Sequence, residues 1–273
     1  MSLLHIIVIA LVQGITEFLP ISSSGHLILV PSLTGWPDQG LAIDVAVHIG
    51  TLLAVLIYFK EDTKGLFFAA CGSMGIASAR RVIEGTLYQK LFWALIVATL
   101  PVVVIGFAAK TLGLIDMMRT IEIIGWTSIV FGILLYWADR SASISKVLNH
   151  MALKPAFIIG LSQVLALIPG TSRAGITMTS ARWLGFSRTE AARFSMLLSI
   201  PTIAAAGLLG VLDIIEQGSD ILMIDAIETG VLACLAALFA IHFLMKWLTH
   251  SSMTIFVIYR VFLGTGLLLY VYM

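Results

Sequence analysis

The sequence predicts an all-α polytopic membrane protein, and three observations carry that prediction. Of the 273 residues, 59% are hydrophobic and only 11% are charged, and the mean hydropathy is +1.04. Soluble domains are close to half apolar and a quarter charged, so this chain departs far from them. Six apolar runs can each form a helix of about 20 residues, which crosses a hydrocarbon core of roughly 30 Å. Two further apolar segments are interrupted by Pro and Gly.

The six uninterrupted runs predict six transmembrane helices, at 41–59, 91–109, 121–138, 190–212, 226–246 and 252–272. Residues 61–90 are too irregular for an assignment. The net charge is only +1 and the basic residues are spread over the predicted loops. No nucleic-acid partner is therefore expected.

The two interrupted segments, 3–30 and 156–185, predict re-entrant helix-loop-helix hairpins. The interruptions are Pro20, Gly25 and Pro31 in the first and Pro169, Gly170 and Gly175 in the second. Pro breaks a helix, and irregular backbone at membrane depth is tolerated only where protein or a cavity surrounds it. The alternative is that each segment is a kinked ordinary span.

The order of the elements predicts an inverted-topology repeat within a single membrane domain, 1–273. The first repeat would be 1–138, the joint 139–154 and the second repeat 155–273. Three spans separate the hairpins, so the second hairpin enters from the opposite face and the two tips meet near mid-membrane. Both tips read Gln, five or six residues, Pro, one residue, two hydroxyl residues, one residue, then Gly within two positions.

Charge asymmetry predicts the orientation. Acidic residues dominate the predicted loop at 213–225. Basic residues gather in two other loops: Lys60, Lys64, Arg80, Arg81 and Lys90, then Arg140, Lys146 and Lys154. Basic loops are cytoplasmic, which places both termini and the mouth of the first hairpin outside.

The first tip carries a carboxylate and a run of hydroxyls. Gln13 and Glu17 are four residues apart and share a helical face. A lone carboxylate costs about 3 kcal/mol at the bilayer centre, so Glu17 is expected to face a cation, water or a protonated partner. The alternative is a carboxylate near the interface or in a helix–helix hydrogen bond.

The run that follows suits phosphate chemistry, with three hydroxyls, a flexible point and an imidazole: Ser22, Ser23, Ser24, Gly25 and His26. Backbone N–H groups at such a turn bind phosphoryl oxygens, a Ser can act as nucleophile, and a His can move a proton. A Ser helix cap with an interfacial His is the plainer reading.

The second tip, Pro169-Gly-Thr-Ser-Arg173, supplies a positive charge. The guanidinium of Arg173 matches two phosphoryl oxygens, and Thr177 lies four residues later on the same helical face. Alternatively, Arg173 snorkels or pairs with a carboxylate such as Glu17.

The two tips together predict a divalent cation, because a carboxylate beside a phosphate is repulsive without one. Gln13 and Glu17 offer oxygen ligands that suit Mg²⁺ or Ca²⁺. The other polar residues within the spans are expected to be structural, with Asp44 and His48 as a pair and Glu228 and Arg260 elsewhere.

These motifs resemble the bacterial undecaprenyl-diphosphate phosphatase family, also called bacitracin-resistance proteins. The similarity lies in Gln13-x-x-x-Glu17, in Pro20-Ile-Ser-Ser-Ser-Gly-His26, and in Pro169-Gly-Thr-Ser-Arg173 with Thr177. Two positions depart from the family pattern: Ala174 stands where Ser is usual, and Gln13 takes the amide option, which removes a negative charge.

The resemblance implies metal-dependent hydrolysis of the C55 isoprenyl diphosphate to the monophosphate, recycling the lipid carrier for peptidoglycan. Glu17 with Gln13 would hold the metal, and Ser23 and His26 would be nucleophile and proton-transfer partner, in either order. The substrate-binding residues implied are Ser22, Ser24, Gly25, Gly170, Ser172, Arg173 and Thr177.

The same resemblance implies a multi-pass protein of the bacterial cytoplasmic membrane whose active site faces outward. Its expected partners are undecaprenyl diphosphate, membrane lipids and, as one option, a second copy in a homodimer.

Two other functions have different sequence requirements. A lipid phosphatase of the acid-phosphatase type would need Lys-x6-Arg-Pro and a His five residues after a Ser-Arg pair, and the sequence has neither. A lipid or ion transporter suits the inverted hairpins but has less need of Glu17, Ser23 and His26 together.

Overall fold

The six predicted spans are present as helices. The computed structural model describes residues 1–141, 146–217 and 223–273, and within them the structure is helical apart from connections and one isolated β-bridge between Lys146 and Phe186. The spans are α3 (Gly40–Tyr58), α6 (Leu87–Thr111), α8 (Ile121–Ser141), α11 (Arg188–Gln217), α12 (Met223–His250) and α13 (Thr254–Tyr272). All six are long and apolar enough to cross a bilayer, so the chain is a multi-pass membrane protein.

Both interrupted segments are broken helices. The first consists of α1 (Leu3–Thr16) and α2 (Ser23–Thr34), and the second of α9 (Leu153–Gln163), the 3₁₀ turn η2 (Val164–Leu167) and α10 (Arg173–Trp183). The breaks are shorter than predicted: they cover residues 17–22 and 168–172. Gly25 and Pro31 lie inside α2 and Gly175 inside α10. A helix accommodates single Gly residues and a Pro with a bend, so these three residues do not end it.

Three further regions differ from the sequence prediction. Residues 61–90 are largely ordered into α4 (Lys60–Ser73) and α5 (Ala77–Ile83), followed by the start of α6. Short turns occur at α7 (Leu114–Met117) and η1 (Leu148–His150). The predicted acidic loop is mostly helix, because α11 extends to Gln217 and α12 starts at Met223. Residues 218–222 of that loop and 142–145 of the predicted joint lie outside the described residues.

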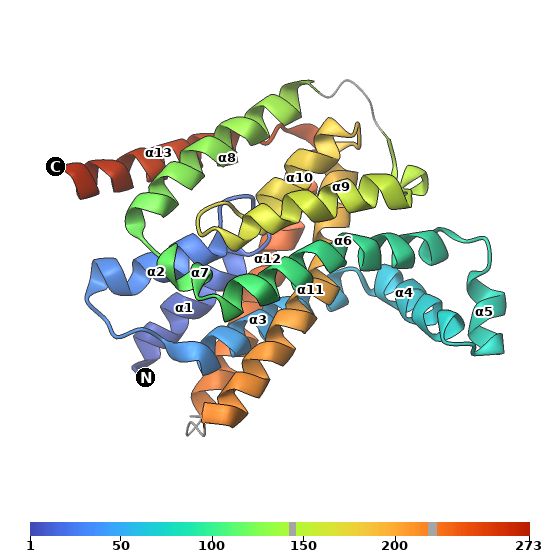
Figure 1. Cartoon of the computed structure of the whole chain (residues 1–273), viewed down its shortest axis with the longest axis horizontal. Helices are drawn as coiled ribbons and strands as arrows, with labels where there is room; N and C mark the ends of the chain where they lie inside the picture. Colours follow the sequence, from blue (N-terminus) through green and yellow to red (C-terminus); the bar gives the residue numbers. More distant parts are fainter. Residues whose placement is uncertain (142–145, 218–222) are drawn as a thin grey trace.

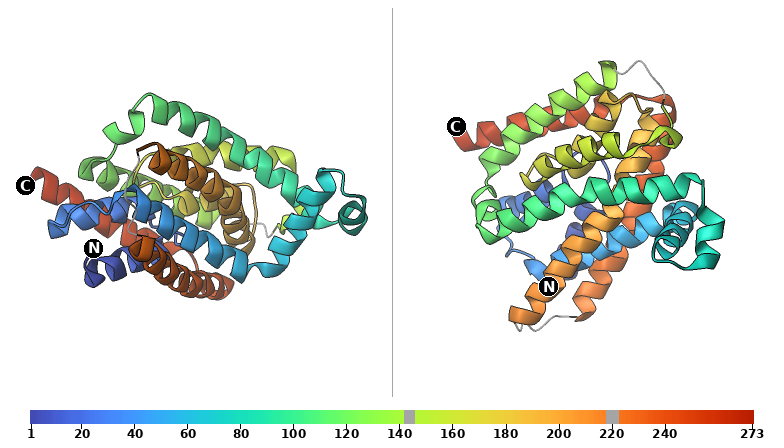
Figure 2. Two further views of the ribbon diagram at one scale, coloured as in Figure 1. Left: turned by 90° about the horizontal axis from the view of Figure 1, so that it is seen from below. Right: turned by 45° about the vertical axis from the view of Figure 1, so that its right-hand side comes forward.

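The helices pack in pairs drawn from opposite halves of the chain. Helix α3 packs against α12 and α8 against α13, while α1 packs on α12 and α9 on α6 (Figures 1 and 2). Two Gly residues permit close approach at the broken segments: a Cβ on Gly14 would lie 2.6 Å from the Ala233 carbonyl oxygen, and one on Gly160 would strike the Ala98 backbone. Small residues of this kind drive helix association in membranes. Each broken segment is thereby fixed to a span of the other half.

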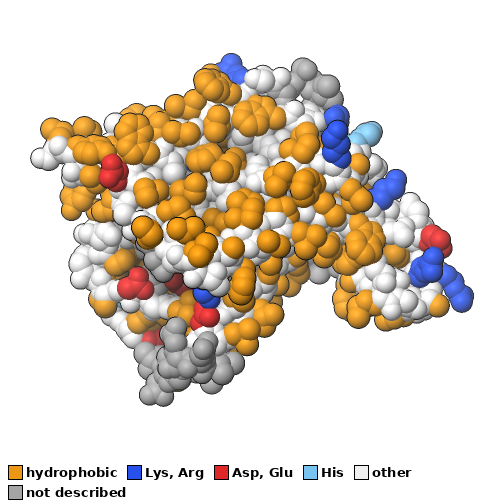
Figure 3. All heavy atoms as spheres, in the orientation of Figure 1, with side chains coloured by type: hydrophobic (Ala, Val, Ile, Leu, Met, Phe, Trp, Pro, Cys, Tyr) orange, Lys and Arg blue, Asp and Glu red, His pale blue; other side chains and the backbone are white. Residues whose placement is uncertain are grey.

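Apolar side chains cover most of the face seen in Figure 3, where orange atoms lie over the spans and basic groups gather at the end with α4 and α5. The exposed apolar side chains include Leu53, Val104, Leu208 and Phe262. Large exposed apolar areas are unusual in soluble proteins and expected where lipid surrounds the helices.

Candidate active site

The two breaks share one backbone feature, a Ser with positive φ that caps the following helix. Ser22 and Ser172 each cap the helix that follows, with φ of 76° and 70°. Each Ser Oγ accepts a hydrogen bond from the N–H three residues on, from Gly25 at 3.4 Å and from Gly175 at 3.0 Å. A non-Gly residue with positive φ costs about 1–2 kcal/mol, and such strain clusters at functional sites.

A buried arginine ties the breaks together. Arg260 on α13 is 0% exposed. Its guanidinium donates to the Pro20 carbonyl in the first break, at 3.3 Å, and to the Gly170 carbonyl in the second, at 2.9 Å. It also donates to the carbonyls of Thr127 and Ser128 on α8, at 3.3 and 3.2 Å. Carbonyls freed by a broken helix need donors when buried, so Arg260 has the structural role that the sequence suggested.

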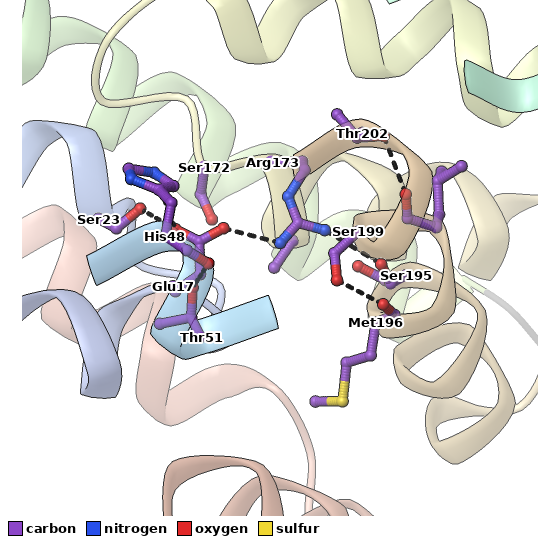
Figure 4. Close-up of polar contacts among 12 residues, drawn as sticks. Glu17, Ser23, His48, Thr51, Ser172, Arg173, Ser195, Met196, Ser199 and Thr202 are labelled. Carbon is purple, nitrogen blue, oxygen red and sulfur yellow. Dashed lines mark hydrogen bonds and ion pairs between the residues drawn. The ribbon is translucent and has the colours of Figure 1, made fainter. Parts of the chain in front are cut away.

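An ion pair joins the two breaks across the site. Arg173 Nη2 lies 2.9 Å from Glu17 Oε1, and both side chains are mostly buried. Arg173 Nη1 also donates to the Ser195 carbonyl on α11 at 3.1 Å, which fixes the guanidinium plane (Figure 4). The pairing with Glu17, an alternative to phosphate binding in the sequence analysis, is therefore present.

The second carboxylate oxygen of Glu17 accepts two further hydrogen bonds. Ser23 Oγ donates to Oε2 at 2.6 Å, and Gln13 Nε2 donates to the same oxygen at 2.9 Å. Figure 4 shows Ser23, Glu17 and Arg173 in sequence along this chain of contacts. A hydroxyl bonded to a carboxylate is the arrangement of a nucleophile with its general base.

These side chains line a cavity of about 200 Å³. Six predicted site residues line it: Glu17, Ser22, Ser23, Ser24, Ser172 and Arg173. Its remaining walls are mainly apolar and come from α6, η2 and α11: Val102, Ala166, Leu167, Ile203 and Ala206. A polar end facing an apolar wall is suited to an amphipathic ligand.

Five predicted site residues lie outside the cavity lining: Gln13, Gly25, His26, Gly170 and Thr177. His26 Nδ1 bonds the Ser22 carbonyl at 2.6 Å and Nε2 bonds the Tyr259 hydroxyl at 2.5 Å. Thr177 is buried and bonds the Arg173 carbonyl at 2.8 Å and Ser195 Oγ at 2.7 Å. These two residues therefore bond the backbone and side chains next to the cavity.

Three polar cavity residues were not predicted as site residues: His48, Gln163 and Thr202. His48 was expected to be structural, yet Nε2 lies 4.0 Å from Glu17 Oε2. Gln163 belongs to the second tip motif and lies where Gln13 lies in the first, so the repeat pattern could have identified it. For Thr202 no local signal exists, because only packing brings α11 to the breaks.

The donor set fits a hard divalent cation in part. Within the described residues, no group of three or more His, Cys, Asp or Glu side chains could hold a metal. Glu17 supplies one carboxylate, and Gln13 Oε1 is buried without a hydrogen-bond partner. Mg²⁺ commonly takes one or two carboxylates and completes its shell with water and substrate phosphate, which is compatible with this site.

Fold and site define a class: a multi-pass helical membrane protein whose Ser23, Glu17 and Arg173 side chains meet where two helices break. The profile of the family described as bacitracin resistance protein BacA matches residues 6–266. The chain belongs to this family, and the resemblance drawn from the motifs is confirmed.

Curated relatives match along their full length. An undecaprenyl-diphosphatase of Roseobacter denitrificans is 48% identical over 272 residues, covering 100% of both chains. That of Dinoroseobacter shibae is 48% identical over 276 residues, and that of Alteromonas mediterranea 46% over 273, again covering 100% of both chains in each case.

Proposed function

We propose that the protein is an undecaprenyl-diphosphate phosphatase. It hydrolyses undecaprenyl diphosphate to undecaprenyl phosphate and inorganic phosphate, which recycles the lipid carrier for peptidoglycan and other envelope polymers and confers bacitracin resistance. The observation that carries the proposal is the Ser23–Glu17–Arg173 chain of contacts in one cavity. The relatives' shared name supports the same activity.

In this mechanism Ser23 is the nucleophile. Its Oγ attacks the terminal phosphorus while Glu17 accepts the hydroxyl proton, and the P–O bond to the bridging oxygen breaks, releasing undecaprenyl phosphate. Glu17 then passes that proton to solvent. Water attacks the phosphoserine and gives its proton to Glu17, which returns it to Ser23 Oγ as the P–Oγ bond breaks, freeing inorganic phosphate and the Ser23 hydroxyl. Arg173 turns from Glu17 toward the phosphoryl oxygens and stabilises the charge that develops on them.

Glu17 would hold a divalent cation, Mg²⁺ or Ca²⁺, next to the bound substrate. When bound, such a cation neutralises diphosphate charge. Gln13 would ligate only through Oε1, because the amide nitrogen that now faces Glu17 has no lone pair for a cation.

Other residues in and around the cavity have binding or positioning roles in this scheme. Ser22, Ser24 and Ser172 present hydroxyls to the phosphates, with backbone N–H groups at the starts of α2 and α10. Gly25 and Gly170 shape the two turns. His26 holds the Ser22 turn through its contact with Tyr259, and Thr177 holds the start of α10.

The broken segments would be re-entrant hairpins related by an inverted repeat, 1–138 and 155–273. The shared cap geometry of Ser22 and Ser172 and the reciprocal packing of α1 on α12 and α9 on α6 support this. The first hairpin would open to the outside of the cytoplasmic membrane and the second to the cytoplasm. The basic groups at the end with α4 and α5 support that orientation. A homodimer stays a prediction.

The test is phosphate release from undecaprenyl diphosphate by detergent-purified protein, with EDTA or with added Mg²⁺ or Ca²⁺. We expect metal-dependent release that is lost in Glu17→Ala and Arg173→Ala. An unchanged rate in folded Ser23→Ala would exclude Ser23 as nucleophile. No release by folded wild type under any metal would refute the phosphatase and leave lipid-phosphate transport as the alternative.

A further inference from the structure

We propose that His48 is a nitrogen ligand of the divalent cation in this site, sharing it with Glu17. The inference rests on the proposed function and adds to it a ligand that the motifs do not contain. His48 lies on α3, outside both breaks. It lines the cavity, and its side chain is 35% exposed.

The orientation of the imidazole is fixed by its other nitrogen. His48 Nδ1 lies 2.6 Å from the Asp44 carbonyl oxygen. A carbonyl only accepts hydrogen bonds, so Nδ1 carries the proton, and in the neutral ring Nε2 keeps a free lone pair. Metal-binding histidines almost always donate their second N–H in this way, often to a backbone carbonyl. The free nitrogen is the one nearer Glu17.

The distance between the two groups suits a shared ion. His48 Nε2 and Glu17 Oε2 are 4.0 Å apart. Two ligands that each lie about 2.1 Å from one cation are separated by roughly 3.0 Å at a right angle and about 4.2 Å in line. The pair can therefore close on one cation with little movement of either side chain.

His26 provides an internal contrast. Its Nδ1 makes the same backbone contact, with the Ser22 carbonyl at 2.6 Å, but its Nε2 is bonded to the Tyr259 hydroxyl at 2.5 Å. His26 is also absent from the cavity lining, whereas His48 belongs to it. Two histidines thus share one tautomer-fixing contact, and only His48 has a nitrogen available to a ligand in the site.

A carboxylate with an imidazole also changes the expected metal preference. Carboxylates suit Mg²⁺, Ca²⁺ and Mn²⁺, while imidazole favours first-row transition ions. Mn²⁺ accepts both ligand types, so we expect the site to bind Mn²⁺ more tightly than Ca²⁺.

The experiment is electron spin echo modulation of Mn²⁺ bound to the full-length protein in detergent. The protein carries no polyhistidine tag, and methylenediphosphonate serves as a non-hydrolysable diphosphate. We expect ¹⁴N modulation from a directly bound imidazole in wild type and in His26→Gln, and its loss in His48→Gln. The Mn²⁺ dissociation constant of His48→Gln should rise by at least about tenfold, since even loss of a partner outside the metal's own ligands costs 10- to 100-fold.

Labelling wild type with ¹⁵N at histidine alone provides a test that needs no variant, because the ¹⁴N pattern must then change to that of ¹⁵N. Bound Mn²⁺ without imidazole modulation in wild type, or modulation that persists in His48→Gln, would overturn the inference and reduce His48 to an ion-pair partner of Glu17. Absence of Mn²⁺ binding would overturn it as well. Phosphate release by the same preparation separates these results from failure of the proposed function.

Discussion

The two helix breaks have similar backbone conformations but carry side chains of opposite charge. In both, a buried Gln precedes by nine residues a Ser that caps the next helix at positive φ, and a carbonyl of the break accepts from Arg260. The first break carries Glu17, and the residue after its capping Ser is the hydroxyl Ser23. The second carries no carboxylate, and the residue after its capping Ser is Arg173.

This difference lets two turns of similar backbone geometry contribute different groups to one site. A strained cap and freed backbone groups create the same polar turn twice, and the packing brings the two turns together. In the proposed mechanism the base Glu17 and the nucleophile Ser23 belong to one turn, and the phosphate-binding guanidinium of Arg173 belongs to the other. Neither break alone has a complete site, so changes to either should act on the same chemical step.

The largest effect is expected from Glu17→Gln. The amide keeps the shape but cannot accept the Ser23 proton, so kcat should fall by at least about 10³-fold. The measurement is steady-state phosphate release at saturating substrate. Thr202→Val, which removes a cavity hydroxyl from α11, is the matched control. An equal loss of kcat in both variants would contradict the role of Glu17 as the base.

Arg260→Leu should affect both breaks together. It leaves the Pro20 and Gly170 carbonyls without their guanidinium donor, and a buried unpaired carbonyl costs about 1–3 kcal/mol. We expect a lower Tm and activity reduced about 100-fold. Arg81→Leu, an exposed arginine on α5, should leave both unchanged. A normal Tm with full activity in Arg260→Leu would mean that the breaks hold each other without Arg260.

Ser22→Ala and Ser172→Ala test the equivalence of the caps. Each removes an Oγ that accepts from a glycine N–H, so each should lower the free energy of unfolding by about 1 kcal/mol. Ser→Gly at either position should cost less, because Gly adopts the positive φ freely. Denaturation by SDS measures both pairs. A large loss of stability at one break only would contradict the equivalence of the two Ser caps.

Tyr259→Phe should have the smallest effect. Removing the hydroxyl frees His26 Nε2 but leaves its bond to the Ser22 carbonyl, so the first turn loosens slightly. We expect kcat to fall less than about tenfold, with KM nearly unchanged. A fall in kcat as large as that in Glu17→Gln would mean that His26 takes part directly in the reaction.

The sequence predicted the fold better than the site. Long apolar runs determine spans by length alone, and Pro20 and Pro169 marked both breaks. Motif spacing also brought together Glu17, Ser23 and Arg173. It did not predict the contact between His26 and Tyr259, because Tyr259 lies on a distant helix that local spacing does not place. It treated His48 as structural for the same reason: the face of α3 that meets the cavity is decided by packing against other helices.

The most direct test of the central claim, that two breaks form one site, is a double-mutant cycle on kcat/KM with Glu17→Gln, Arg173→Lys and the double variant. If both residues act on one transition state, the double variant should be little slower than the worse single variant, with coupling above about 1.4 kcal/mol. Losses that simply multiply would contradict the account, because they would mean that the two breaks act independently.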